Sequence, residues 1–237
     1  MDRRGGDTLV IENGDEAVQK GRKRIRLLPR LRRPALEAGW KFFRQWMRSP
    51  REMSSLSPSS RELAQKMTDE LLKSTSRVIE LGGGTGAVTR ALLAFGVAPA
   101  DLLVLELNQT LSVHLKHVFP EVVVECADAV DLAGIAANSG WLAGGMADAV
   151  VCGLGLLAMS PATQRRVLTA AFALLVPNGR FVLFTYGPAN PIAREVMQDL
   201  NLGARRGGFT LKNLPPATVY VLTRNRSKRV QPQPRAR

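Results

Sequence analysis

The feature that most constrains this chain is a regular alternation of two kinds of segment, which begins at Arg77. Short runs rich in β-branched and large apolar residues alternate with longer runs whose apolar residues recur every three or four positions. The expected strands are 77–81, 101–107, 121–126, 147–153 and 180–186. The expected helices between them are 85–95, 110–119 and 161–175. Strand–helix repeats of this length predict an α/β fold, with a parallel sheet and helices on both faces.

The end of this region departs from the alternation. Residues 202–214 and 215–224 are both strand-like, and Pro215-Pro216 lies between them without an intervening helix. A parallel pair needs a long crossover connection, whereas antiparallel strands can be joined by a short turn. We therefore expect a final antiparallel strand in an otherwise parallel sheet.

Composition divides the chain into four regions. Residues 1–33 are polar and increasingly basic, and we expect them to be largely disordered. Residues 34–75 are expected to form helices, 76–224 the α/β domain, and 225–237 a basic, flexible tail. With 237 residues, of which 45% are hydrophobic, the chain can bury one sizeable core.

Positive charge is concentrated ahead of the domain. The formal net charge is +13, and residues 17–51 account for +11 of it, with twelve Lys or Arg and one Glu. A cluster of this kind indicates a polyanionic partner, which can be nucleic acid or an anionic membrane surface. No window reaches the 18 or so apolar residues of a spanning helix, and acidic residues near Met1 are not typical of a signal peptide.

An aromatic and basic segment follows Pro34. Leu36, Trp40, Phe43 and Met47 recur at helical spacing, with cations displaced around the helix. The sequence therefore predicts an amphipathic helix that ends before Pro50.

A glycine-rich turn carries the first chemical signal. In VIELGGGTG, Glu80 ends a strand, and Gly82, Gly84 and Gly86 follow before a helix. Such a turn lets bare backbone approach a ligand at the helix N-terminus. With Ala87 the pattern also satisfies a relaxed dinucleotide fingerprint, so an NAD site is an alternative at this point.

Two acidic positions, one after each of the next two strands, favour a cofactor that contains a single nucleoside over NAD. Glu106 ends the second strand, where a carboxylate can accept both ribose hydroxyls. Asp128 follows the third strand, where its carboxylate and the backbone N–H of Ala129 can hold an adenine edge. E-x-G-x-G-x-G, the acid after strand two and Asp-Ala after strand three together resemble the class I S-adenosylmethionine-dependent methyltransferases.

The resemblance can be narrowed. The segments LSPSSRELAQKM, VIELGGGTGAVTRALLAFGV, FALLVPNGRFVLFTYGP and KNLPPATVYVLTR are similar to the bacterial phospholipid N-methyltransferases, which convert phosphatidylethanolamine to phosphatidylcholine. The similarity spans about residues 35–224. It implies a Rossmann-like class I methyltransferase fold, with a mostly parallel seven-stranded sheet, an antiparallel last strand and an N-terminal amphipathic helix.

The resemblance also implies site residues and a cofactor, S-adenosylmethionine. The cofactor residues that carry over are Glu80, Gly82, Gly84, Gly86, Glu106, Asp128 and Ala129. Tyr186, in FTYGP, carries over as a candidate catalytic residue near the transferred methyl group. This chain departs from the family pattern at Gly83 and Gly155, where the family has proline, and the second change loosens a loop beside the methyl-transfer pocket.

A lipid substrate implies a membrane partner. We expect the protein to be cytoplasmic and peripheral on the inner face of a bacterial cytoplasmic membrane, with phosphatidylethanolamine as substrate. An amphipathic helix with aromatic and basic faces suits this attachment. The residues expected to contact the anionic surface are Trp40, Lys41, Phe42, Phe43, Arg44, Trp46 and Arg48. No protein partner can be inferred.

Two other functions remain as alternatives. RNA adenine N6-methyltransferases share the cofactor motifs, but they carry an Asn-Pro-Pro-aromatic type motif where this chain has Cys152 and the apolar GLGLL. We therefore expect no nucleic-acid partner. The second alternative is a membrane-binding protein that keeps the fold without activity, and the intact acidic and glycine positions argue against it.

The remaining candidate ligands predict no metal site. His114 and His117 form H-x-x-H, but no further set of Cys, His or acidic residues completes a zinc site. Cys126 and Cys152 lie in apolar runs, and we expect both to be buried, reduced core thiols.

Overall fold

In the computed structural model of the chain, the described residues are 58–187, 189–211 and 216–225. The expected amphipathic helix lies outside them, and with it all seven residues from Trp40 to Arg48 that are expected to contact a membrane. None of the helices in the described part of the chain has the length and apolarity that crossing a bilayer requires.

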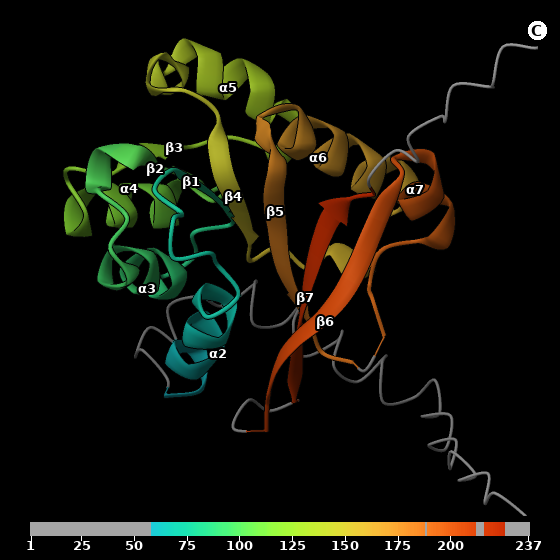
Figure 1. The fold of residues 1–237 in the computed structure, drawn as a ribbon. Helices are drawn as coiled ribbons and strands as arrows, with labels where there is room; N and C mark the ends of the chain where they lie inside the picture. The colour runs from blue at the N-terminus through green and yellow to red at the C-terminus, as the bar shows by residue number, and fades with distance from the viewer. Residues whose placement is uncertain (1–57, 188, 212–215, 226–237) are drawn as a thin grey trace, which may run out of the picture. The chain divides into compact units, whose positions relative to one another are not determined.

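Seven strands and six α-helices make up the described residues (Figure 1). The strands are β1 Val78–Leu81, β2 Leu102–Leu105, β3 Val123–Glu125, β4 Ala147–Cys152, β5 Leu175–Thr185, β6 Leu202–Thr210 and β7 Ala217–Arg224. The helices are α2 Pro58–Thr68, α3 Ala87–Phe95, α4 Gln109–Val118, α5 Leu132–Asn138, α6 Pro161–Ala173 and α7 Arg194–Asp199.

The strands form one sheet in the order β3-β2-β1-β4-β5-β7-β6. β1 to β5 pair in parallel, and β7 is antiparallel to both of its neighbours, β5 and β6. The prediction of a mostly parallel seven-stranded sheet with an antiparallel last strand is confirmed. Because two antiparallel pairings separate β6 from β5, these two strands run in the same direction and end at the same edge of the sheet.

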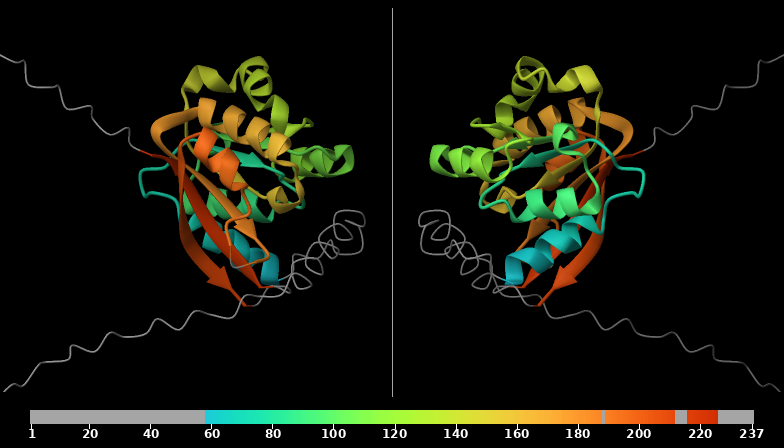
Figure 2. Two further views of the ribbon diagram at one scale, coloured as in Figure 1. Left: turned by 90° about the vertical axis from the view of Figure 1, so that its right-hand side faces the viewer. Right: turned by 90° about the vertical axis from the view of Figure 1, so that its left-hand side faces the viewer.

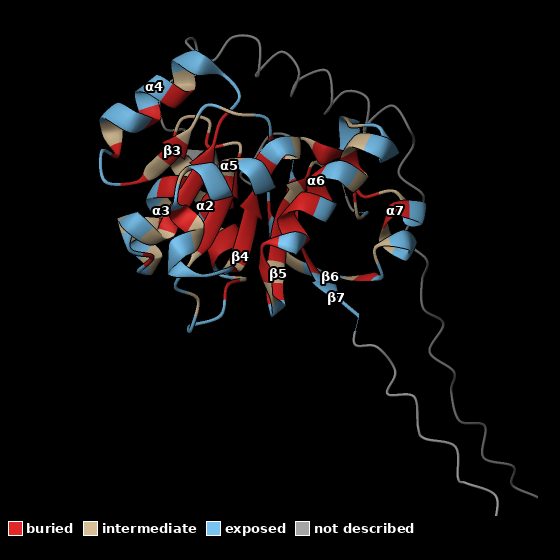
Figure 3. Cartoon of the chain, turned by 90° about the horizontal axis from the view of Figure 1, so that it is seen from above, coloured by how far each residue is buried: buried red, intermediate tan, exposed pale blue. Residues whose placement is uncertain are grey.

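Helices cover both faces of the sheet (Figure 2). Residues of α2, α3 and α4 pack on one face and residues of α5, α6 and α7 on the other, so there are two apolar layers. The strands between them are buried, whereas the outer helix faces are exposed (Figure 3). Because both faces of β1 and β2 are covered, nearly every position in these two strands is apolar, and apolar and polar residues do not alternate.

Three features differ from the expectation or extend it. Helices α5 and α7 are not predicted, because each has fewer than eight residues and too few turns to give a clear apolar period.

The prediction that both cysteines are core thiols is wrong for Cys126, which is exposed because β3 ends at Glu125 and the chain then leaves the sheet. Cys152, the last residue of β4, is buried as expected.

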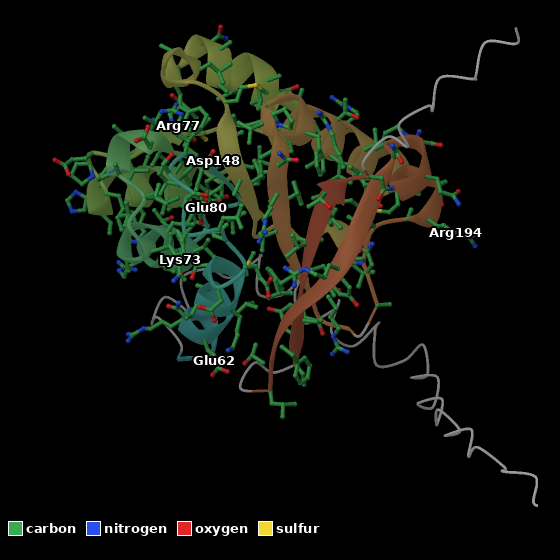
Figure 4. The ribbon with its side chains drawn as sticks, in the orientation of Figure 1. Glu62, Lys73, Arg77, Glu80, Asp148 and Arg194 are labelled. Atoms are coloured by element: carbon green, nitrogen blue, oxygen red, sulfur yellow. The ribbon has the colours of Figure 1, made fainter. Side chains whose placement is uncertain are left out.

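One carboxylate ties the start of β1 to β4, at the edge opposite the glycine turn. Asp148 Oδ2 accepts hydrogen bonds from the backbone N–H groups of Ser76 (2.8 Å) and Arg77 (3.0 Å) and from the Ser76 hydroxyl (3.0 Å). Burial by itself raises the pKa of the Asp148 carboxyl, but these hydrogen bonds and the Arg77 charge outweigh it and hold the pKa below its ordinary value. Figure 4 shows Arg77 and Asp148 close together.

Replacing this carboxylate should destabilise the fold. We expect Asp148→Ala to lower the free energy of unfolding in urea at pH 7 by about 1 to 3 kcal/mol, because three donors lose a charged acceptor. The loss should shrink as the pH falls below about 4, because the stabilisation is present above the unfolded pKa and disappears as the folded carboxyl is protonated.

Asp199→Ala is the matched control for this prediction. Asp199 pairs with Arg165, and both side chains are largely exposed, so its removal should cost less than about 1 kcal/mol. Equal effects of the two substitutions at pH 7 would contradict the role assigned to Asp148.

Candidate functional site

The glycine turn between β1 and α3 is built from left-handed backbone. Gly82, Gly84 and Gly86 have φ values of 80°, 54° and 81°, a region that other residues adopt only with strain. A Cβ on Gly84 would meet no protein atom within 4 Å, so at this point the backbone faces open space. A Cβ on Gly86 would lie 2.6 Å from the Phe119 ring, so this glycine is required for packing.

Glu106 links the turn to the end of β2. Its two carboxylate oxygens accept hydrogen bonds from the backbone N–H groups of Gly84 and Asn108, each at 2.8 Å. The structure therefore brings together the glycine turn and the acid after strand two, as the sequence predicts. An ionised carboxylate has about four lone-pair sites, so two remain for a further donor such as a hydroxyl.

Glu80 lies fully buried near the end of β1 (Figure 4). Its Oε2 accepts a hydrogen bond of 2.7 Å from the Thr89 hydroxyl on α3, and its Oε1 is buried without a partner in the described structure. Burial raises the pKa of Glu80 to about 8, against a smaller lowering by the bonds from Thr89. A buried polar atom without a partner carries an energetic cost, and a ligand that donates to Oε1 would remove it.

Asp128 and Ala129 lie in the loop after β3. The Asp128 carboxylate is exposed and accepts a hydrogen bond from Val130 N–H at 3.0 Å, which caps the short 3₁₀ turn Ala129–Asp131. Ala129 is buried against the α5 and α6 layer. Because β3 is the neighbour of β2, this loop ends at the same edge of the sheet as Glu106.

The loop after β4 lies directly against the glycine turn. Gly153 N–H donates to Leu81 O at 2.8 Å, and a Cβ on Gly153 would lie 2.8 Å from Gly82 O. A Cβ on Gly82 would in turn meet the Leu154 side chain at 2.7 Å. Gly153 has no room for a Cβ beside Gly82 O, and Gly82 has a positive φ, so both positions favour glycine and the loop where this chain has GLGLL packs directly on the turn.

Gln164 on α6 holds that loop in place, and the sequence analysis did not identify it. Its buried amide nitrogen donates to Leu156 O (2.8 Å) and Pro191 O (3.1 Å), and its amide oxygen accepts from Ala193 N–H (2.8 Å). One side chain thus joins the loop after β4 to the segment that follows β5. A polar residue among the buried positions Val167 and Leu168 of an amphipathic helix is the signal that could have indicated it.

Tyr186 directly follows β5. Its ring packs edge-on against Phe184, with centroids 5.3 Å apart, on the face of the sheet covered by α2. Burial raises the pKa of Tyr186, so the side chain is a neutral phenol at physiological pH. β4 lies between β5 and β1, which separates Tyr186 from the glycine turn by two strand spacings, or about 10 Å.

Thr185 is a second residue that the sequence analysis missed. It precedes Tyr186, is only 4% exposed, and its hydroxyl is buried without a partner in the described structure. Its side chain lies on the face opposite Tyr186, because successive strand residues alternate. Both residues therefore flank the carboxyl end of β5, where the loop held by Gln164 also lies.

Among the described residues, no group of three or more Cys, His, Asp or Glu side chains could hold a metal ion. His114 and His117 are both exposed on α4.

No family model matches the chain, and no curated protein matches it. Solved structures do. The glycopeptide N-methyltransferase MtfA, complexed with S-adenosylmethionine, is 13% identical, with a TM-score of 0.55 over 72% of this chain and 96% of that chain. The N-methyltransferase NodS from Bradyrhizobium japonicum WM9, in complex with S-adenosylhomocysteine, is 15% identical, with a TM-score of 0.56 over 78% of this chain and 98% of that chain.

A third match is the 1,6-didemethyltoxoflavin-N1-methyltransferase of Burkholderia thailandensis, bound to 1,6-didemethyltoxoflavin and S-adenosylhomocysteine. It is 14% identical, with a TM-score of 0.52 over 82% of this chain and 90% of that chain. These likenesses show that the chain has the Rossmann-like methyltransferase fold.

Glu80 should make the stability of the ligand-free protein depend on pH. Its folded pKa of about 8 lies above the usual unfolded value, so between the two the folded state keeps a proton that the unfolded state has lost. The free energy of unfolding should then fall as the pH rises from about 4 to 8, by at most about 1.4 kcal/mol per pH unit. We expect Glu80→Gln to remove this slope and to exceed the wild type in stability at pH 7 to 8, as measured by urea unfolding across the range.

Glu121→Gln, at an exposed position before β3, should follow the wild-type profile. Parallel pH profiles for wild type and Glu80→Gln would show that Glu80 is not held protonated by burial.

Proposed function

We propose that this protein is an S-adenosylmethionine-dependent N-methyltransferase that acts on phosphatidylethanolamine, and on its monomethyl and dimethyl products, at a membrane surface. One observation carries the cofactor part of the proposal. The open backbone at Gly84 lies within hydrogen-bond distance of Glu106, beside a buried Glu80 whose Oε1 has no partner in the described structure.

The residues present fit the cofactor. Glu106 has free lone pairs where ribose hydroxyls can donate, and the space in front of Gly84 admits a ligand close to the backbone. Glu80 Oε1 can accept from a donor or lie beside a positive charge, which removes the cost of its burial. The exposed Asp128 carboxylate and the Ala129 N–H suit an adenine edge. MtfA and NodS, which share the fold, were crystallised with S-adenosylmethionine and S-adenosylhomocysteine.

Gly84→Ala tests the cofactor site with a matched control. Gly84 and Gly140 both have positive φ, and a Cβ on either would meet no protein atom within 4 Å. Alanine should therefore cost each a similar backbone strain of about 1 to 2 kcal/mol. Only Gly84→Ala should lose S-adenosylmethionine binding, by tenfold or more, when both variants are measured by calorimetry at temperatures where they are folded. Equal affinities in the two variants would place the cofactor elsewhere.

The chemistry requires a neutral amine. When bound, S-adenosylmethionine supplies an electrophilic methyl group on a sulfonium. The lone pair of a neutral substrate nitrogen would accept this methyl group, the electron pair of the carbon–sulfur bond would remain on sulfur, and the methylated ammonium would release a proton to solvent. A primary ammonium resembles lysine, so at pH 7 only about one in 2,500 is neutral, a cost of about 4 to 5 kcal/mol. Partial desolvation and a nearby positive charge both favour the neutral amine, and alignment of the reacting atoms supplies further rate.

Tyr186 and Thr185 are the candidates that position the amine. A phenol that burial keeps neutral is a hydrogen-bonding group and not a base. The Thr185 hydroxyl, buried without a partner in the described structure, can accept from the amine or donate to the phosphate ester beside it. Neither role needs a strong general base, because desolvation and a nearby positive charge lower the pKa of the amine, so that it can lose its proton to solvent.

Three observations support a lipid as the methyl acceptor. The loop against the glycine turn carries two apolar side chains that are not fully buried, Leu154 and Leu157, where an enzyme that grips a flipped base would need polar and aromatic groups. The sequence segments quoted above resemble phospholipid N-methyltransferases along most of the chain. The basic and aromatic segment before residue 51 suits peripheral attachment to the anionic inner face of a bacterial membrane.

A methyl-transfer assay separates this proposal from its alternatives. The full chain is incubated with labelled S-adenosylmethionine and either vesicles of phosphatidylethanolamine and anionic lipid or ribosomal RNA, and lipid products are separated by headgroup. We expect label in methylated phosphatidylethanolamines only. Label in RNA alone would favour an RNA adenine N6-methyltransferase. No label in either, together with retained vesicle binding, would favour an inactive membrane-binding protein.

A further inference from the structure

Exposed apolar side chains gather at one edge of the sheet. Seven large apolar residues are exposed in the described part of the chain, and four of them follow or end strands at the edge that carries the glycine turn. These four are Leu107 after β2, Leu157 after β4, and Phe209 and Leu211 at the end of β6. Leu211 is 73% exposed and is the most exposed of the seven.

The sheet register places the end of β6 beside the candidate site. Thr218 of β7 pairs with Thr185 of β5 on one side and with Phe209 of β6 on the other. Phe209 is therefore two strand spacings, or about 10 Å, from the unpartnered Thr185 hydroxyl. Directly paired residues share a face of the sheet, so Phe209 lies on the same face as Thr185, and Leu211 lies near it, two residues further on.

This end of β6 is held firmly. Thr210, between the two exposed residues, is buried and donates to Glu62 Oε1 at 2.8 Å. Glu70 accepts from Gly208 N–H at 2.9 Å and from the Arg205 guanidinium at 2.6 Å. Because α2 fixes the strand from the opposite face, the exposure of Phe209 and Leu211 is not the result of a loose chain end.

A cation lies next to the apolar side chains. The exposed Arg206 guanidinium lies over the Phe209 ring, 5.7 Å from its centroid, whereas Arg205 lies on the other face of β6 and pairs with Glu70. Basic groups beside protruding aromatic and aliphatic side chains are the combination that binds the interface of an anionic bilayer.

We infer that Leu157, Phe209 and Leu211, here called the apolar rim, enter the interfacial region of an anionic bilayer when the protein is attached to it. This inference rests on the proposed function, which supplies the reason for a lipid surface. The rim is a second contact, separate from the segment before residue 51. It turns the open edge of the sheet toward the membrane, so that a lipid amine can reach the site while its acyl chains stay in the bilayer.

The rim suits a bilayer better than a nucleic acid. Single-stranded nucleic acids are bound by several aromatic rings along a basic groove. Here only one of the three rim residues is aromatic, and the two leucines have no stacking face. Aliphatic side chains at this exposure gain most by leaving water for an apolar medium.

A fluorescent label tests the inference without reference to activity. In the full chain with Cys126→Ser, the substitutions Leu211→Cys and Leu157→Cys provide single accessible thiols for an environment-sensitive dye. Cys152 should stay unlabelled, because burial raises its pKa to about 12. Met146→Cys is the control, since Met146 is 44% exposed against 43% for Leu157 but lies before β4, at the opposite edge of the sheet.

With vesicles of phosphatidylethanolamine and phosphatidylglycerol, the dye at both rim positions should shift to the blue and gain roughly twofold or more in emission. The dye at position 146 should not respond. A rim dye that stays in water while the protein sediments with the vesicles would overturn the inference, as would the same response from all three positions. A response to RNA and none to vesicles would assign the surface to nucleic acid.

The rim and the proposed substrate can fail separately. A rim response on vesicles, without methylation of phosphatidylethanolamine, would uphold the bilayer contact and reject the substrate. Methylation of vesicle lipid without a change in the emission of the rim dye would uphold the substrate and reject the bilayer contact. The double variant Phe209→Ser, Leu211→Ser should keep the S-adenosylmethionine affinity of the wild type and lose fivefold or more of the transfer to vesicle lipid, and unchanged transfer would count against the rim.

Discussion

The hydrogen bond from Gly84 N–H to Glu106 joins the turn after β1 to the end of β2, and the geometry of the candidate site depends on it. The turn can reach this carboxylate only because its glycines adopt left-handed backbone. The loop after β4 then rests on the turn through the contact between Gly153 and Gly82 O, and Gln164 ties that loop to the segment after β5. The ends of β1, β2, β4 and β5 are thereby linked to one another, through the Glu106 carboxylate, the Gly153 backbone and the Gln164 amide.

The two ends of the parallel strands differ in how far their polar groups are satisfied. At the amino ends of β1 and β4, Asp148 has three hydrogen-bond donors, and Arg77 forms an ion pair with Asp101 and lies over the Trp141 ring. At the carboxyl ends, Glu80 and Thr185 each keep a buried oxygen without a partner in the described structure. Such groups lower stability unless a ligand satisfies them, which is a cost that proteins commonly accept where they bind or react.

The sequence predicts the mostly parallel sheet, and it predicts that the glycine turn and Glu106 lie close together. Strong local signals explain this, because three closely spaced glycines indicate a left-handed turn and Glu106 directly follows a buried strand. The residues around the carboxyl end of β5 are harder to predict. The positions of Thr185 and Gln164 depend on how β5, α6 and the loop after β4 pack together. No local sequence pattern indicates that the Gln164 amide bonds to two loops. Cys126 shows the opposite error, because it follows the apolar residues of β3 in the sequence but lies one residue past the end of that strand, where the chain is exposed.

The buried Glu80 would couple the binding of a charged ligand to the release of a proton. With a pKa of about 8, its carboxyl is mostly protonated near neutral pH in the ligand-free protein. A sulfonium or ammonium group placed beside it would favour the carboxylate, so binding of a cationic ligand would expel a proton to solvent. Affinity for such a ligand would rise with pH until the carboxyl is ionised without it, whereas a neutral product would bring the proton back. The protonation state of Glu80 would thus change with the charge of the bound ligand, so that a cationic cofactor and a neutral product would differ in the pH dependence of their affinities.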